Sequence, residues 1–273
     1  MIPAQFEYVE ATSVADAVRL LGELGDDAKL LAGGHSLIPL MKLRLVTPTT
    51  LIDITHVKEL SFIEERGNTV VVGALTRHRD IERSTLVAEH VPLLAHAAGL
   101  VGDPQVRNRG TIGGSLVHGD PAADLPAVAL ATGATMIITG PSGERRVSAD
   151  DFFVDFLETA VGQGEILTAI EFPKHTGAGW AYDKFVRRAM DYAIVGVAVQ
   201  LGSAPRIALV NMSNTPHLAV AASEALSRNA SASEVAALVA NGAHPQEDLN
   251  ATVEYREHLA RVLTQRALTA ASR

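Results

Sequence analysis

Two glycine-rich phrases, LLAGGHSLIPLMKLRL at residues 30–45 and RGTIGGSLVHGD at residues 109–120, decide how this chain is read. A Gly–Gly pair between a strand and a helix can adopt positive φ and direct successive backbone N–H groups at one point. Such a point suits an anion, above all a phosphate. One phrase alone is also typical of an ordinary tight turn. Two in one domain favour a dinucleotide whose pyrophosphate is held by backbone.

Neither phrase has the spacing of the common nucleotide-binding motifs. AGGHS is not GxGxxG, and no Walker lysine follows in GGHSLIP. These departures disfavour a nicotinamide-binding Rossmann site and a P-loop NTPase. Arg107 and Arg109 lie just before TIGGS, where their charge can offset that of a phosphate.

The composition excludes several classes of partner. The 273 residues are 47% hydrophobic with a net charge of −8, which is typical of a globular protein large enough for two domains and without a basic face for nucleic acid. The longest uncharged apolar stretch, residues 125–140, is shorter than the ~20 residues that span a bilayer, so we expect no membrane span. MIPAQFEYVEA at the N-terminus resembles no signal sequence, and we expect a cytoplasmic protein.

Cysteine is absent, which removes disulfides, thiol nucleophiles and iron–sulfur ligation by this chain. Redox work would need a bound organic cofactor or a metal held by histidines and carboxylates. The ten histidines are scattered without a tight ligand spacing, so we predict no metal site. We interpret His78, His90 and His96 as surface or packing residues.

The first 56 residues predict a small parallel unit. Apolar strand-like runs and two helical patterns alternate as strand, helix, strand, helix, strand: 6–10, 13–24, 28–33, 36–45 and 49–54. Ser13 and Ser36 are the expected helix N-caps. Ligands of such units bind beyond the carboxyl ends of the strands, which is where Gly33 and Gly34 fall.

Residues 57–175 change to a mixed pattern. Hairpins are predicted around residues 67–68 and 141–143, helices over 76–84 and 91–101, and a further strand at 165–173. Between them, we expect a long polar and glycine-rich loop from residue 103 that leads into a helix starting near Ala122 to Asp124.

The last part of the chain predicts a separate unit. KHTGAG, residues 174–179, is a plausible boundary. Three strand-like runs precede three alanine-rich helical stretches: 181–188, 193–201 and 205–213, then 217–228, 231–242 and 253–271. The sequence therefore predicts an α+β protein with domains at 1–175 (subdomains about 1–56 and 57–175) and 176–273.

Three phrases in this order carry a family resemblance: AGGHSLIPLMKLRL, VRNRGTIGGSLVHGDPAADLPAVALA and DKFVRRAMDYAIVGVAV. Together they resemble the FAD-binding medium subunits of the molybdenum hydroxylase (xanthine dehydrogenase) family, and most of all the branch of aerobic carbon monoxide dehydrogenases. The resemblance covers nearly the whole chain. It implies a two-part FAD-binding domain of the PCMH or vanillyl-alcohol-oxidase type, followed by a small domain of a three-stranded sheet and helices.

The resemblance also implies which residues contact FAD, which this branch binds without a covalent bond. Two grips on the pyrophosphate are implied: Ala32, Gly33, Gly34, His35 and Ser36, then Thr111, Ile112, Gly113, Gly114 and Ser115. It gives Asp124 the acidic contact to the adenosine half, Val101 an apolar contact, and Leu167 and Lys184 places on the flavin side. Tyr192 would stack on the isoalloxazine. On the residues alone, Asp124 could instead be a helix N-terminal charge and Tyr192 a core tyrosine.

The implied function is electron transfer. An FAD-carrying subunit of this family accepts electrons from a small iron–sulfur subunit and passes them to an external acceptor, while a large molybdenum subunit oxidises the substrate. The molybdenum cofactor and the clusters would lie on those partners, in a dimer of heterotrimers placed in the cytoplasm or peripherally at the inner membrane face. No catalytic acid, base or metal ligand is assigned to this chain.

Three alternatives stay open from the sequence. A medium subunit for purine, aldehyde or N-heterocycle oxidation would look similar. A self-sufficient FAD oxidoreductase of the same fold would need its own proton donor over the flavin, and a FAD-binding scaffold module would need no partner electrons.

Overall fold

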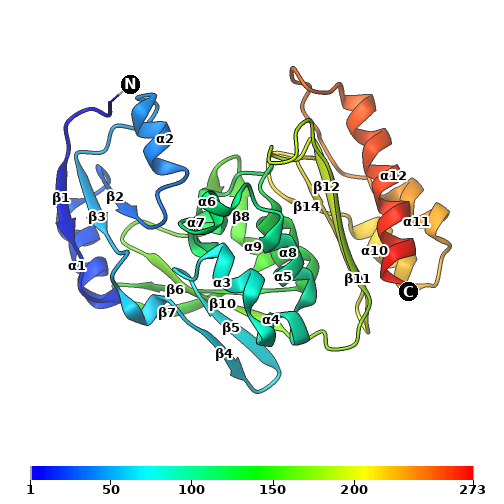
Figure 1. The fold of residues 1–273 in the computed structure, drawn as a ribbon, viewed down its shortest axis with the longest axis horizontal. Coiled ribbons are helices and arrows are strands. Elements are labelled where there is room, and N and C mark those ends of the chain that lie inside the picture. The colour runs from blue at the N-terminus through cyan, green and yellow to red at the C-terminus, as the bar shows by residue number, and fades with distance from the viewer. Residues whose placement is uncertain (1, 273) are drawn as a thin grey trace.

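The computed structural model describes residues 2–272, so the outer ends predicted for the two domains, 1 and 273, lie outside it. The chain forms three parts that lie side by side, with the blue N-terminal part at the left of Figure 1 and the yellow-to-red C-terminal part at the right. None of the helices within residues 2–272 combines the length and the apolar character that crossing a bilayer requires.

The N-terminal part is the predicted parallel unit. Its elements are β1 (Glu7–Glu10), α1 (Val14–Leu24), β2 (Ala28–Leu31), α2 (Leu37–Lys42) and β3 (Thr50–Asp53). The strands form one parallel sheet in the order β1-β3-β2. Ser13 caps α1 by accepting from the Asp16 N–H, whereas Ser36 precedes α2 without a side-chain cap. The sheet directs the carboxyl end of β2 towards the middle part.

The middle part is built on a five-stranded sheet. Its strands are β4 (Ile63–Arg66), β5 (Thr69–Gly73), β6 (Thr135–Gly140), β7 (Gly143–Ser148) and β10 (Ile166–Pro173), in the order β4-β5-β10-β6-β7. All neighbouring strands are antiparallel, and both predicted hairpins are present. A short 3-10 helix, η1 (Lys58–Leu60), leads into this part, and β8 (Phe153–Asp155) and β9 (Glu158–Thr159) form a small hairpin of their own.

The helices of the middle part include four that the sequence did not predict. The helices are α3 (His78–Arg83), α4 (Thr85–His90), α5 (Pro92–Gly99), α6 (Pro104–Arg107), α7 (Ile112–His118), α8 (Asp124–Thr132) and α9 (Ala149–Phe152), and the four unpredicted ones are α4, α6, α7 and α9. The expected loop from residue 103 contains α6 and α7. Asp103 and Thr111 cap these helices through their side chains, and Gly113 and Gly114 occupy the first turn of α7. The caps outweigh the poor helix propensity of glycine.

The C-terminal part has the predicted order of strands followed by helices, with one more strand. It comprises β11 (Trp180–Phe185), β12 (Val195–Gln200), β13 (Arg206–Val210), β14 (His217–Leu218), α10 (Val220–Ser227), α11 (Ala232–Leu238) and α12 (Val253–Ala271). The sheet is four-stranded because the two-residue β14 pairs with β13 at the expected start of a helix. Helix α12 packs on β11 and β12.

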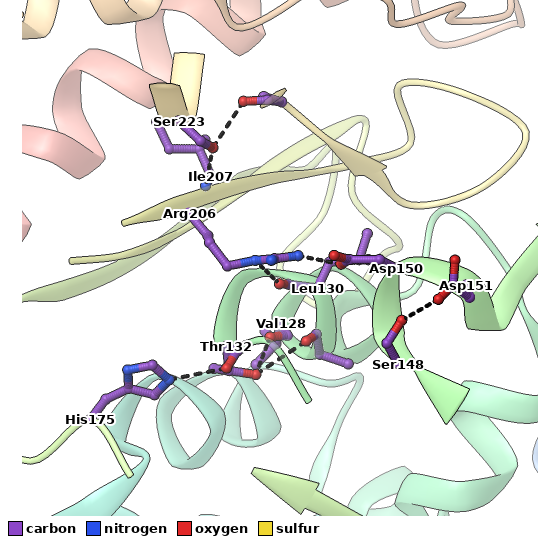
Figure 2. A network of polar contacts seen from close by, with 12 residues as sticks. Val128, Leu130, Thr132, Ser148, Asp150, Asp151, His175, Arg206, Ile207 and Ser223 are labelled. Atoms are coloured by element: carbon purple, nitrogen blue, oxygen red, sulfur yellow. Dashed lines mark hydrogen bonds and ion pairs between the residues drawn. The ribbon is translucent and has the colours of Figure 1, made fainter. Parts of the chain in front are cut away.

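Helix α8 joins the middle and C-terminal parts. All nine of its residues are buried, and it packs against α5 and β10 on one side and against β12 and β13 on the other. The N–H groups of Gly133 and Ala134 donate to the carbonyls of Leu130 and Ala129, and further donors to the last carbonyls come from elsewhere in the chain. Arg206 donates from Nε to the Leu130 carbonyl (2.8 Å), and His175 Nε2 donates to the Thr132 carbonyl (3.1 Å), as Figure 2 shows.

The same arginine reaches a second element of the middle part. Its guanidinium also bonds the Asp150 carboxylate on α9 (Figure 2). The C-terminal part is therefore held to the middle part by buried apolar surface and by donors to the end of α8.

Arg206→Met should lower the free energy of unfolding by about 1–3 kcal/mol, because the Leu130 carbonyl loses a charged donor in a buried place. Urea unfolding followed by circular dichroism measures the change. Arg228→Met is the matched control, since Arg228 is an exposed arginine whose ion pair with Glu224 (3.8 Å) should be worth no more than about 0.5 kcal/mol. Equal losses in the two variants would contradict a special role for Arg206.

Candidate functional site

A cavity of about 670 Å³ lies where the three parts meet. This volume falls within the ~300–1,000 Å³ typical of cofactor sites. The lining residues come from four stretches and a few single positions: 21–40, 101–124, 161–167 and 190–192, with Ile54, Ala74, Leu75 and His78. Because no single part could form this cavity, its shape depends on how all three pack.

The first glycine segment, residues 32–36, lines the cavity between β2 and α2. Gly34 has φ +77°, a conformation that L side chains rarely adopt. Within residues 2–272, the N–H groups of 33–36 donate to no other group of the chain. They can therefore bind an anion without breaking an existing hydrogen bond.

The second glycine segment, residues 111–115, is the start of α7 and not an open turn. The N–H groups of Ile112 and Gly113 donate to the carbonyls of Thr76 (3.0 Å) and Ala74 (2.8 Å), and that of Gly114 donates to Thr111 Oγ1 (3.2 Å). A Cβ on Gly113 would lie 2.6 Å from the Ala74 Cβ. Here glycine serves mainly close packing, so this segment offers less free backbone than the first.

The two segments touch each other. A Cβ on Gly33 would collide with the Arg109 carbonyl oxygen and lie 2.9 Å from the Gly110 Cα. Gly33 is thus required by packing, whereas a Cβ on Gly114 would meet only Thr111 Oγ1, at 2.9 Å. A larger residue at Gly33 would disturb the packing of the two segments, whereas a larger residue at Gly114 would mainly reduce the space in the cavity.

Asp124, the first residue of α8, reaches the cavity and is paired with two residues of β11. Lys184 Nζ lies 3.0 Å from each carboxylate oxygen, and the Tyr182 hydroxyl donates to Oδ1 (2.5 Å). Lys184 also donates to the Leu100 carbonyl (2.8 Å). Burial raises the pKa of Asp124, while Lys184 and Tyr182 oppose this rise.

Most of the remaining predicted contacts also line the cavity. Val101, Leu167 and Tyr192 do, together with Thr111, Gly113, Gly114 and Ser115. Tyr192 is 63% exposed, which excludes its interpretation as a core tyrosine. Ile112 is fully buried and does not line the cavity. Lys184 does not line it either, but it forms an ion pair with Asp124, which does.

Several lining residues were not predicted. Met190, Asp191 and the stretch 161–166 carry no sequence signal, because they are brought to the cavity by tertiary packing. His78 was interpreted as a surface or packing residue, yet it is 4% exposed and lines the cavity. No group of three or more His, Cys, Asp or Glu side chains suited to a metal ion occurs among the described residues.

The comparisons with known proteins agree with this architecture. Residues 4–175 match the family "FAD binding domain in molybdopterin dehydrogenase", and residues 180–271 match "CO dehydrogenase flavoprotein C-terminal domain".

Two relatives show how far the similarity extends. The carbon monoxide dehydrogenase medium chain of Hydrogenophaga pseudoflava is 44% identical, over 99% of this chain and 98% of its own length. The 6-hydroxypseudooxynicotine dehydrogenase complex subunit alpha of Paenarthrobacter nicotinovorans is 37% identical, over 99% and 96%. A solved structure of the Hydrogenophaga pseudoflava carbon monoxide dehydrogenase superposes with a TM-score of 0.96 at 45% identity and covers 100% of this chain and 99% of that one.

Lys184→Met should cost about 3–5 kcal/mol of stability at neutral pH, because it leaves the buried Asp124 carboxylate without its cation. The loss of Lys184 removes a lowering influence, so the pKa of Asp124 rises further above its unfolded value. The protonated carboxyl is then the form that the fold favours, so the deficit should shrink as pH falls through the raised pKa towards the unfolded one. Urea unfolding of the variant and wild type at pH 8 and pH 5 measures this.

The control for this test is a second substitution, at Asp124, that nearly conserves the volume of the side chain. Adding Asp124→Asn in the Lys184→Met background removes the unpaired charge and should recover part of the lost stability at neutral pH. A deficit that is independent of pH, or no recovery in the double variant, would contradict the ion-pair explanation.

Proposed function

The chain belongs to the family of FAD-binding subunits of the molybdopterin dehydrogenases, and from this premise we propose that it is the medium chain of an aerobic carbon monoxide dehydrogenase. It is a flavoprotein chain of a multi-subunit molybdenum enzyme. The observation that carries the proposal is the cavity in which both glycine segments and the exposed ring of Tyr192 meet. The family matches to 4–175 and 180–271 support our proposed domain boundary near residue 175.

The residues around the cavity fit FAD. The free N–H groups of residues 33–36 suit a pyrophosphate, and the exposed ring of Tyr192 offers a face on which a flat ring system can stack. The buried Nδ1 of His78 has no partner among the described residues. Together these features suit a ligand that has both a polar part and a flat aromatic part.

We place the pyrophosphate between Ala32–Ser36 and Thr111–Ser115, with His35 contributing backbone and no covalent bond. Asp124 and Lys184 were assigned to opposite halves of FAD by the resemblance. Since they form an ion pair at 3.0 Å, we propose that they face the same part of the cofactor. Val101 and Leu167 would then supply apolar contacts, and Tyr192 would cover the isoalloxazine.

The chain's own residues bind, orient and shield the cofactor. When bound, FAD supplies a centre that can accept electrons one at a time, as iron–sulfur clusters deliver them, and can hold two. The apolar walls and the Tyr192 ring limit the access of water, and the Lys184–Asp124 pair keeps a fixed polar group at the cavity edge. No residue of this chain is given the role of a catalytic acid or base.

The electrons must come from other chains, because this one has no cysteine to ligate a cluster. We propose a small iron–sulfur subunit as donor and a large molybdenum subunit as the site of substrate oxidation, in a cytoplasmic dimer of heterotrimers that passes electrons to an external acceptor. Carbon monoxide is favoured as the substrate because identity over nearly the whole chain is 44% to a carbon monoxide dehydrogenase chain and 37% to a relative named for another substrate.

Gly114→Val should weaken FAD binding at least about tenfold while the fold survives, because Gly114 lines the cavity and the added Cβ meets no group but the side-chain hydroxyl of Thr111. Visible flavin absorbance retained after gel filtration measures binding, and circular dichroism checks the fold. Gly22→Val is the control, since Gly22 is an exposed helical glycine with nothing within 4 Å of an added Cβ. Stoichiometric FAD in the Gly114 variant would rule out the pyrophosphate position.

The subunit role makes a further prediction. The chain expressed alone should bind FAD and be yellow, yet carbon monoxide should not reduce it. Adding the iron–sulfur and molybdenum subunits should produce loss of flavin absorbance that depends on carbon monoxide. Reduction of the isolated chain by an organic substrate would instead support the self-sufficient oxidoreductase, and a colourless chain would support the scaffold.

A further inference from the structure

His78 contacts Gly110, the residue that immediately precedes the second glycine segment. It begins α3, and its backbone N–H donates to the Gly110 carbonyl (3.0 Å). The edge of its imidazole lies so close to Gly110 that a Cβ there would be 2.8 Å from Cδ2 and 2.9 Å from Nε2. The side chain is therefore fixed in place at the wall of the cavity.

The ring nitrogens of His78 have no hydrogen-bond partner in the part of the chain that the structure describes. Nδ1 is buried and unpaired, and Nε2 takes part in none of the hydrogen bonds found within residues 2–272. A buried polar group without a partner is costly, and native proteins retain few of them. Because Nδ1 has almost no accessible surface, Nε2 is the ring nitrogen that a ligand in the cavity could reach.

The second glycine segment offers the hydroxyl of Ser115 to the cavity but few free backbone donors. The N–H groups of Ile112, Gly113 and Gly114 are already bonded within the chain. An anion held between the two segments would find free N–H groups on the first segment but would need side-chain donors on the second. His78 is the buried donor that lies next to that segment.

We propose that His78 donates a ring N–H hydrogen bond to the pyrophosphate of bound FAD. This inference rests on the proposed function, since it requires that the pyrophosphate lies between the two glycine segments. The His78 side chain, at the start of α3, would then add a cofactor contact to those made by the backbone of residues 33–36.

The charges around His78 fit a neutral donor. Burial, with smaller contributions from His35 in the first segment and Arg107 on α6, lowers the pKa of His78 from 6.5 to about 4. Arg107 is itself paired with Glu82 of α3 (3.0 Å). A neutral imidazole keeps one N–H to donate, and the negative charge of a bound phosphate would raise the pKa of His78.

The test measures FAD affinity in four proteins: wild type, His78→Leu, His78→Asn and His78→Gln. Leucine fills the space without a donor and should weaken binding about tenfold, which corresponds to about 1.4 kcal/mol. An amide restores a donor, Asn near the position of Nδ1 and Gln near that of Nε2, so one of the two should recover most of the affinity. His96→Leu is the control, because His96 stacks on Trp180 (5.3 Å) away from the cavity and should leave FAD affinity unchanged.

A second measurement uses the wild-type protein. Imidazole NMR signals of His78, assigned by comparison with His78→Gln, should shift on adding FAD, and the pH at which they titrate should rise. Wild-type FAD affinity in His78→Leu, or NMR signals of His78 that do not change on adding FAD, would contradict the proposed hydrogen bond. His78 would then be a core-packing residue. Failure of the wild type to bind FAD would contradict the proposed function itself.

Discussion

The burial of helix α8 on every side is the constraint on which the rest of the structure depends. A helix that is apolar all round must be enclosed by protein, and α8 is enclosed by both large sheets. Its polar ends then need partners from the C-terminal part: Lys184 and Tyr182 at Asp124, and Arg206 at the Leu130 carbonyl. The contacts that dock the C-terminal part also fix the position of Asp124 at the cavity, so docking and site geometry share one cause.

The contact between Gly33 and the backbone at 109–110 links the docking of the N-terminal part onto the middle part to the geometry of the site. It sets the N-terminal sheet against the start of α7, and no residue larger than glycine allows this approach. The two segments nevertheless play different parts. The first presents free N–H groups, while the second uses two of its N–H groups, those of Ile112 and Gly113, to anchor α7 to the residues that follow β5.

The sequence predicted those features that depend on local pattern. The parallel unit of the first 56 residues, the two hairpins and the strands-then-helices order of the last part were all predicted from periodicity and turn residues. Helix α7 was missed because two glycines disfavour a helix locally, whereas the Thr111 cap and packing on Ala74 stabilise it. The cavity positions of His78 and Tyr192 follow from long-range packing, which periodicity does not report. The cofactor contacts came from the resemblance, and neither Ile112 nor Lys184 is among the residues that line the cavity.

A cavity with walls from residue 21 to residue 192 also couples the binding of a cofactor to the docking of the three parts. Its last wall does not exist until the loop before β12 has been synthesised and the C-terminal part has closed over α8. The complete site therefore exists only when the three parts are docked, and the binding free energy of a cofactor adds to that docking by mass action, by about 2.7 kcal/mol when free ligand is 100-fold above the dissociation constant.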